Sequence, residues 1–156
     1  MTDERSRVQD DDINYGVFHN SLGYLLRRAQ LRMFQQYQQT FAETGIKPTQ
    51  FGVLELIAEN PGLSQSAIAQ ALSIQRTNMV GLLDALQKRK LIERRPSPQD
   101  RRTHALHLTD EGRALREAML EDFVRIDHSL IELVGDENIA AMQEGLTRII
   151  ESEIPG

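Results

Sequence analysis

The residues best suited to chemistry stand in one basic turn. Asp100, Arg101 and Arg102 follow two prolines, Pro96 and Pro98, which restrict the backbone and stiffen the turn. A narrow DNA minor groove has a strongly negative potential that attracts an arginine side chain. A carboxylate two residues away can hold that guanidinium in one pose. The pattern therefore predicts a loop that inserts Arg102 into a minor groove. The alternative is that the arginines only supply the solubilising charge that any exposed loop needs.

A second set of polar residues opens a helix predicted over residues 75–89. The first turn of a recognition helix is the part that reaches base edges in the major groove. Side chains of these types suit hydrogen bonds to bases and phosphates, and capping of the helix is their alternative role. The residues concerned are Gln75, Arg76, Thr77 and Asn78.

Two further candidates for DNA contact lie along the outward face of the same helix. Gly81 follows Thr77 at the helical period, although a glycine costs a helix about 1 kcal/mol relative to alanine. The absent side chain would let the helix approach a base or a phosphate closely, and neutral drift is the alternative explanation. Lys88 begins the run Lys88-Arg89-Lys90, which either contacts DNA or complements the negative end of the helix dipole.

Metal, cofactor and catalytic chemistry are not indicated. The chain has no cysteine, which excludes disulfides, thiolate metal sites and thiol-based redox sensing. His104 and His107 fall on opposite faces of a predicted strand, and no Glu-x-x-His or His-x-x-x-His pair occurs. The segment GLSQS at 62–66 is not a nucleophile motif, and no phosphate-binding glycine loop is present. We therefore expect no metal, no cofactor and no enzymatic activity.

The elements that must position the candidate residues begin with two short helices. Ser64 is typical of an N-cap. The first helix has an apolar face at helical spacing, made of Ala67, Ile68, Ala71 and Leu72. After a break at Ser73-Ile74, the second helix has a packing face of Met79, Leu82, Leu83 and Leu86.

The apolar period then changes from helical to about two. Residues 91–95 read as one strand and residues 103–109 as the returning strand. Leu106 and Leu108 are expected on one side of the returning strand, and Thr103, Ala105 and His107 on the other. This order of elements is that of a winged helix-turn-helix. The predicted fold class is therefore mainly α with a small β-wing.

The charge distribution favours a nucleic-acid partner although the chain is acidic. The net charge is -5 at pH 7, yet residues 76–102 contain eight Lys and Arg against three acidic residues. A basic stretch at the helix-turn-helix keeps the electrostatic footprint of DNA binding. No apolar run is long enough to span a membrane, and no signal peptide is evident. We therefore expect a cytoplasmic protein that binds double-stranded DNA.

The helices outside the winged unit carry more apolar surface than a small domain needs. Helices are expected over 13–43 and 48–60. After Thr109, apolar residues recur at nearly heptad spacing, namely Leu115, Met119, Phe123, Ile126, Leu130 and Leu133. A second copy of the chain would bury such stripes, so we expect a homodimer. The predicted division is a mobile tail at 1–12, dimerisation helices at 13–44 and 113–154, and a winged DNA-binding domain at 45–112.

The wing and the helix before it resemble the MarR family of transcription regulators. The resemblance is carried by Asp100-Arg101-Arg102, Leu106, Leu108-Thr109 and Gly112, and by the preceding segment LLDALQKRKLIERRPSPQD. It extends over about residues 20–150. One departure is Lys90, where the family most often has a glycine. The resemblance implies a dimeric, ligand-responsive regulator, here expected to be a repressor that a small molecule releases from a pseudo-palindromic operator.

The resemblance also implies an effector site in a crevice between the dimerisation helices and the winged domain. Its ligand is expected to be aromatic or anionic, such as an aryl acid or its coenzyme A thioester. Apolar walls are predicted from His19, Leu22, Leu26, Phe51 and Leu54. Carboxylate or phosphate oxygens would be received by Arg27, Arg28 and Arg32. The alternative is that the apolar residues belong to the core and that the arginines are solvated.

A protein-interaction module without DNA binding is the alternative function for a winged helix. The basic residues clustered in the wing argue against it, because a protein partner does not require a concentrated positive charge. A gel shift with duplex DNA would separate the two functions.

Overall fold

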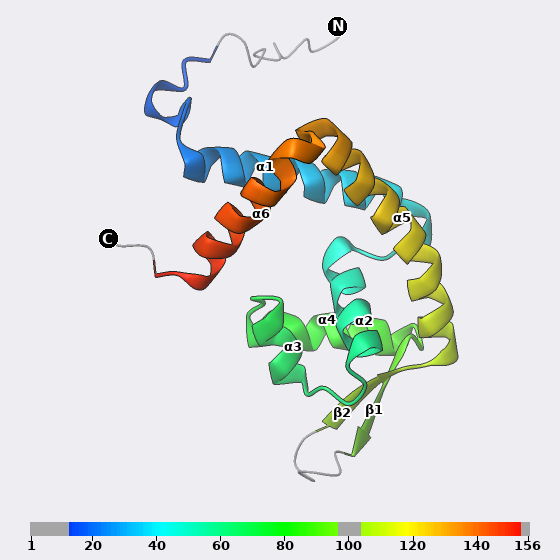
Figure 1. Cartoon of the computed structure of the whole chain (residues 1–156). Helices are drawn as coiled ribbons and strands as arrows, with labels where there is room; N and C mark the ends of the chain where they lie inside the picture. The colour runs from blue at the N-terminus through cyan, green and yellow to red at the C-terminus, as the bar shows by residue number, and fades with distance from the viewer. Residues whose placement is uncertain (1–12, 97–103, 154–156) are drawn as a thin grey trace, which may run out of the picture. The chain divides into compact units, whose positions relative to one another are not determined.

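The computed structural model describes residues 13–96 and 104–153 of the chain (Figure 1). The segments up to Gln36 and from Tyr37 form two compact units, and each is described by itself. The described residues are mainly helical with one two-stranded sheet, which confirms the predicted fold class. The elements are η2 (Gly16–Phe18), α1 (Leu22–Thr40), η3 (Ala42–Thr44), α2 (Pro48–Glu59), α3 (Gln65–Ala71), α4 (Arg76–Lys88), β1 (Ile92–Pro96), β2 (His104–Leu108), α5 (Asp110–Val134) and α6 (Asp136–Glu151).

The helix predicted from Ile13 begins later, after the 3-10 turn η2. The side-chain oxygen of Asn14 accepts a hydrogen bond from the Gly16 N–H at 2.9 Å, and Gly16 has a left-handed φ of 52°. A side chain that bonds the nearby backbone competes with helix formation. The predicted start is therefore wrong, and α1 begins at Leu22.

The core of the winged domain lies where α2, α3, α4 and β2 meet. Leu54 and Ile57 of α2 pack with Ile68 of α3, Leu83 of α4 and Leu106 of β2, and each is at most 1% exposed. Burial of an aliphatic side chain contributes about 1.5–3 kcal/mol. This cluster therefore holds the outward face of α4 in a defined position.

The two wing strands are antiparallel, and a third backbone segment joins them. Ile92 pairs with Leu108 in the register of β1 and β2, while Ser64 forms an isolated bridge with Ala105. The Leu106 N–H also donates to the Leu63 carbonyl at 3.0 Å. Ala105, on the side of the strand opposite Leu106, is only 3% exposed, so both sides of β2 are covered at this point.

The predicted packing face of α3 also needs one correction. Ile68 and Ala69 are buried, whereas Ala71 is exposed. The elements that α3 contacts are α4 and β2, and their position decides which residues of so short a helix become covered. Helical spacing alone predicted Ala71 in place of Ala69.

The turn from α4 into β1 is joined to the start of α5. Lys90 has a φ of 58°, the left-handed conformation that glycine adopts most readily. The Thr109 hydroxyl donates to the Lys90 carbonyl at 2.6 Å and accepts from the Gly112 N–H at 3.0 Å, so Thr109 is the N-cap of α5. A Cβ on Gly112 would stand 1.9 Å from the Leu91 carbonyl oxygen. Only glycine fits this position without a shift of the backbone.

The two C-terminal helices keep large apolar side chains on their surface. Met119 and Ile126 of α5 are buried, whereas Leu133 is 84% exposed and Ile150 of α6 is 81% exposed. Dimerisation through these helices stays a prediction. Across the described ranges, no helix is long and apolar enough to span a membrane.

Candidate nucleic-acid interface and ligand cavity

The polar residues that open α4 all lie on the surface. Gln75 occupies the N-cap with extended backbone, and its side chain makes no capping hydrogen bond. Arg76, Thr77 and Asn78 form the exposed first turn. The capping alternative is therefore not supported for Gln75, and this end of α4 presents polar side chains outward, as direct readout of bases requires.

Gly81 and Lys88 lie farther along α4 and are also exposed. A Cβ on Gly81 would meet no atom within 4 Å, so the fold of the chain does not require glycine there. Close approach of the helix to DNA remains the functional explanation.

Substitution of Gly81 by alanine is expected to have two effects of opposite sign. The free energy of unfolding should rise by up to about 1 kcal/mol, because alanine is the better helix former. Operator binding should weaken about fivefold, or about 1 kcal/mol, because the methyl group holds the helix away from DNA. Urea unfolding and a fluorescence titration measure the two effects separately.

Gly145→Ala in α6 is the matched control, since a Cβ there also meets no atom within 4 Å. It should raise stability without changing the affinity for DNA, and because Gly145 lies in the segment 113–154 expected to dimerise, sedimentation should find its oligomeric state unchanged. An operator affinity of Gly81→Ala equal to that of the wild type would leave neutral drift as the explanation of Gly81.

Arg94, which sequence analysis did not single out, joins the wing to α4. From β1 it donates to the Gln87 side-chain oxygen and to the Asp84 carboxylate, both at 2.7 Å. The contact balances the negative charge of Asp84 on the exposed face of α4, where phosphates would otherwise be repelled. Arg94 lies on a strand and its partners lie on a helix, so neither the strand period nor the helical period of the sequence indicates this pairing.

Arg89 has a structural role in the fold. This role differs from the two considered for the run Lys88-Arg89-Lys90, which were contact with DNA and interaction with the helix dipole. Its guanidinium donates to the Gly45 carbonyl at 3.0 Å and to the Thr44 carbonyl at 2.9 Å. Arg89 therefore ties the end of α4 to the turn before α2. Lys88 and Lys90 are exposed.

A hollow of about 270 Å³ separates α3, the start of α4 and the wing strands. Arg76 of α4 lines it, together with Arg94 and His104 of the wing. Guanidinium and hydroxyl groups are common ligands of DNA phosphates. The remaining lining residues are Ser64, Gln65, Ser66 and Leu106.

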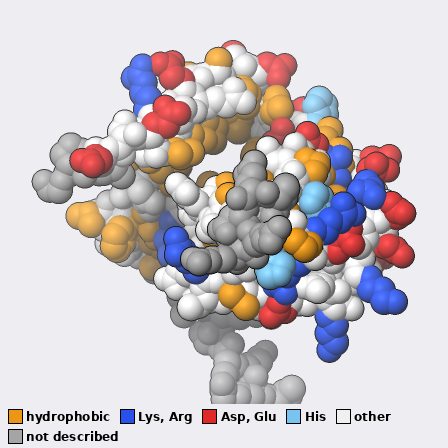
Figure 2. All heavy atoms as spheres, turned by 90° about the horizontal axis from the view of Figure 1, so that it is seen from below, with side chains coloured by type: hydrophobic (Ala, Val, Ile, Leu, Met, Phe, Trp, Pro, Cys, Tyr) orange, Lys and Arg blue, Asp and Glu red, His pale blue; other side chains and the backbone are white. Residues whose placement is uncertain are grey.

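Asp100, Arg101 and Arg102 lie outside the described residues, so their role in the minor groove stays a prediction. The strands that lead to this turn are described, and Pro96 pairs with His104 where they meet it. Figure 2 shows Lys, Arg and His side chains gathered on the lower face of the molecule, interspersed with acidic side chains.

The two histidines of β2 do not belong to a metal centre in the part of the chain that the structure covers. There, no group of three or more His, Cys, Asp or Glu side chains could hold a metal ion. His104 is exposed, and half-buried His107 pairs in register with Glu93.

An apolar cavity of about 360 Å³ lies within the unit that begins at Tyr37. Four aromatic side chains form much of its wall. The rings of Tyr37 and Phe123 stack with centroids 5.4 Å apart, and those of Phe41 and Phe51 lie 5.2 Å apart. Burial raises the pKa of Tyr37, and the charge of Asp127 adds to the effect. The other lining residues are Pro48, Gly52, Glu55, Leu56, Leu72 and Leu120.

The residues predicted for an effector site fall in both units. Phe51 lines the aromatic cavity, whereas Leu54 is fully buried in the core. His19, Leu22, Leu26, Arg27, Arg28 and Arg32 belong to the unit that ends at Gln36. There, the Arg28 guanidinium lies over the Tyr15 ring at 5.7 Å. The role of these residues in ligand binding stays a prediction.

Sequence analysis did not recognise Tyr37, Phe41 and Phe123 as members of one site. Tyr37 and Phe123 occupy apolar stripes of α1 and α5, where a core role explains them equally well. Their proximity in space is the signal that the sequence lacked.

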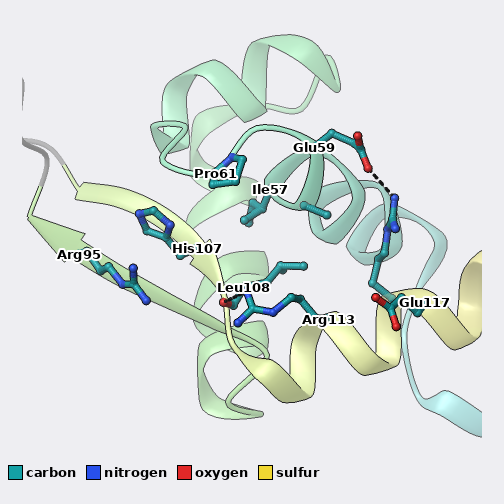
Figure 3. A pocket seen from close by; sticks show the side chains of 10 residues that line it. Ile57, Glu59, Pro61, Arg95, His107, Leu108, Arg113 and Glu117 are labelled. Carbon is teal, nitrogen blue, oxygen red and sulfur yellow. Dashed lines mark hydrogen bonds and ion pairs between the residues drawn. The ribbon is translucent and has the colours of Figure 1, made fainter.

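A second, more polar cavity of about 420 Å³ lies beside the end of α2, the wing and the start of α5 (Figure 3). Arg95 and His107 of the wing line it, together with Glu59 of α2 and with Arg113 and Glu117 of α5. Arg113 donates to the Leu108 carbonyl at 3.1 Å. The cavity wall therefore mixes positive and negative groups.

Arg116 joins α2 to α5 next to this cavity. It donates from Nε and Nη2 to the two carboxylate oxygens of Glu55, both at 2.7 Å, and from Nη2 to Glu59 at 2.8 Å. The hydrogen bond to Glu55 is the main cause that raises the pKa of Arg116. Among the ion pairs of the described ranges, only those of Arg116 link these two helices.

Comparisons with known proteins agree with this geometry. A family model described as MarR family matches residues 44–103. The chain is 39% identical over 116 residues to a putative transcriptional regulatory protein for the hcr operon of Thauera aromatica. The aligned stretch covers 72% of this chain and 70% of that protein. The transcriptional repressor CouR bound to a 23-mer DNA duplex is 42% identical, with a TM-score of 0.80 and coverage of 89% and 99%. CouR bound to p-coumaroyl-CoA is 40% identical, with a TM-score of 0.81 and coverage of 90% and 99%. The chain therefore belongs to the MarR family of winged helix-turn-helix transcription regulators.

Proposed function

We propose that this protein is a homodimeric repressor that leaves a pseudo-palindromic operator when a small aromatic effector binds. The observation that carries the proposal is the exposed first turn of α4 beside the hollow that contains Arg76, Arg94 and His104. Phosphate contacts orient a protein on DNA and base contacts specify the sequence, and this surface offers groups for both. Regulation of transcription in the cytoplasm, and not catalysis, is the activity that we infer.

A second copy would explain the apolar surface of the C-terminal helices. Leu133 and Ile150 are more than four-fifths exposed, and large exposed apolar patches mark interaction sites. We propose residues 13–44 and 113–154 as the dimerisation segments. A two-fold dimer would place its recognition helices about 10 base pairs apart, which requires a pseudo-palindromic operator.

The aromatic cavity supports an effector with an aromatic ring. CouR has been solved with p-coumaroyl-CoA, a thioester whose acyl group contains one phenol ring. We propose an aryl acid or its coenzyme A thioester as the class of effector for this chain, with the ring beside Phe51. The six N-terminal candidates, His19, Leu22, Leu26, Arg27, Arg28 and Arg32, remain proposed contacts on the basis of their residue types.

The test of DNA binding is substitution in the wing. Arg102→Ala is expected to weaken operator binding by about 1–3 kcal/mol and to leave the dimer and its melting temperature unchanged. Asp100→Ala should cost less, because the carboxylate only positions the guanidinium. A fluorescence titration at near-physiological salt, with an operator selected from random duplexes, measures both affinities.

Arg125→Ala provides the matched control, since Arg125 is an exposed arginine of α5 that pairs with Asp122 on the same helix. Because Arg125 lies in the proposed dimerisation segment 113–154, sedimentation should first find this variant in the same oligomeric state as the wild type, and it should then bind the operator like the wild type. Wild-type affinity in both wing variants would exclude the assignment of this turn to the minor groove.

A further inference from the structure

The aromatic cavity has one acidic residue in its wall. Among the residues that the structure describes, Glu55 is the only acidic one that lines it, and the other lining side chains are apolar apart from the Tyr37 hydroxyl. A carboxylate beside aromatic rings is costly to desolvate unless hydrogen bonds satisfy its oxygens. Its position therefore calls for a partner inside or outside the cavity.

Arg116 supplies the partner outside the cavity and holds the carboxylate in one orientation. Its Nε and Nη2 each donate to one oxygen of Glu55 at 2.7 Å, and the same Nη2 donates to Glu59 at 2.8 Å. Arg116 and Glu59 line the polar cavity and are hydrogen-bonded to each other, and Figure 3 marks the bond that Glu59 accepts with a dashed line. The ion pair between Glu55 and Arg116 thus stands between the two cavities.

Glu55 keeps part of its capacity to accept hydrogen bonds. An ionised carboxylate offers about four lone-pair positions, and Arg116 uses two of those on Glu55. The side chain of Glu55 is 33% exposed, against 16% for that of Arg116. A ligand in the aromatic cavity whose donor reaches the Glu55 oxygens would therefore meet an oriented acceptor that still has lone pairs to share.

We propose that Glu55 selects the effector by accepting a hydrogen bond from a neutral donor on its aromatic ring, such as a phenolic hydroxyl. Arg116 is the positioning residue that fixes the acceptor. The inference rests on the proposed function in one respect, namely that the aromatic cavity holds the effector.

The charges around Glu55 disfavour a ligand carboxylate at the same place. Glu55, Glu59 and Arg116 form one hydrogen-bonded cluster with two negative groups and one positive group. A second anion beside Glu55 would lose its own water and meet a like charge. Of the two proposed classes of effector, the thioester is therefore favoured, because its ring enters without a free carboxylate.

Calorimetry of wild-type protein with three small esters tests the selectivity directly. Methyl 4-hydroxycinnamate should bind about tenfold or more tightly than methyl cinnamate, because a hydrogen bond to an ionised acceptor is strong and its absence leaves the acceptor unpaired. The ester with a carboxylate in place of the hydroxyl should bind about tenfold or more weakly than the hydroxylated ester. Equal affinities of the first two esters, tight binding of the third, or no binding of any would overturn the inference.

Variants of the cluster identify the residue responsible. Glu55→Leu should reduce the preference for the hydroxyl to within about twofold while methyl cinnamate still binds. Arg116→Met should lower the preference without abolishing binding, because the acceptor loses its fixed orientation. Glu59→Gln is the matched control, since it alters the same guanidinium contact in the other cavity, and it should keep the preference.

Thermal melting separates this role from a purely structural one. If the ion pair only stabilises the fold, Glu55→Leu and Arg116→Met will lower the melting temperature and leave the ligand preference unchanged, which would overturn the inference. Should Glu55→Leu fail to fold, Arg116→Met and the three esters on wild type give the same readout.

Operator titration of the same wild-type preparation distinguishes failure of the proposed function from failure of the proposed role of Glu55. Failure to bind any selected operator would contradict the proposed function. Operator binding without any preference among the esters would contradict only the role of Glu55.

Discussion

Gly112→Ala is expected to lower the free energy of unfolding by about 3 kcal/mol, the upper end of the usual cost of overpacking, because the new atom would meet rigid backbone. The new Cβ would stand 1.9 Å from the Leu91 carbonyl oxygen and 2.9 Å from the Leu91 carbonyl carbon. These are backbone atoms, which cannot rotate away as a side chain can. The Thr109 N–H also donates to that oxygen at 3.1 Å, so a shift of Leu91 would disturb the cap of α5.

Urea unfolding followed by far-ultraviolet circular dichroism, at one fixed protomer concentration, measures the change. Gly145→Ala again serves as the control and should be stabilised by up to about 1 kcal/mol, as expected for alanine in an open helical position. If the unfolding midpoint of Gly112→Ala equalled that of the wild type, the backbone at Leu91 would be able to move away from α5 at little cost. Glycine would then not be required at position 112.

Operator DNA is expected to weaken binding of the effector about a hundredfold, or about 2.7 kcal/mol, if the effector releases DNA by the same factor. A ligand can shift an equilibrium only through its different affinities for the two states. The aromatic cavity is suited to this coupling because its wall includes Phe51 of α2 and Phe123 of α5, and α2 shares its core with α4. A bound ring therefore contacts the helix that packs against the DNA-binding elements.

Calorimetric titration of p-coumaroyl-CoA into the protein, with and without a selected operator duplex, measures this coupling. A duplex of scrambled sequence is the control and should change the affinity far less at the same salt concentration. Equal affinities in the presence and absence of the operator would rule out the switch, even for a ligand that binds tightly.

The parts of this protein that local spacing determines could be predicted from the sequence. The side chains of Ser64 and Thr109 accept from N–H groups three residues later, at 3.2 and 3.0 Å, as N-caps do. Met79, Leu83 and Leu86 are buried on one face of α4, and the polar residues of its first turn are exposed. Caps and helical faces depend on neighbours within a few positions, so the residue order is sufficient to place them.

Faces that a third element covers could not be predicted in this way. Ala105 lies on the side of β2 opposite Leu106 and forms a bridge with Ser64, and both Ala105 and Leu106 are buried. Alternation along a strand tells which residues share a side, but not which sides become covered.

The aromatic cavity and the ion pair beside it were decided by the tertiary structure alone. Arg116 and Glu55 are 61 residues apart in the chain, and Arg89 is 44 residues from the Gly45 carbonyl that it binds. The sequence shows that the chain has arginines and carboxylates in sufficient number for many pairings. Which pairs form depends on how α2 packs against α5, because a guanidinium donates only along fixed directions and over a short range. No local period encodes that packing, so the pair of Glu55 and Arg116 beside the aromatic cavity became visible only in the folded chain.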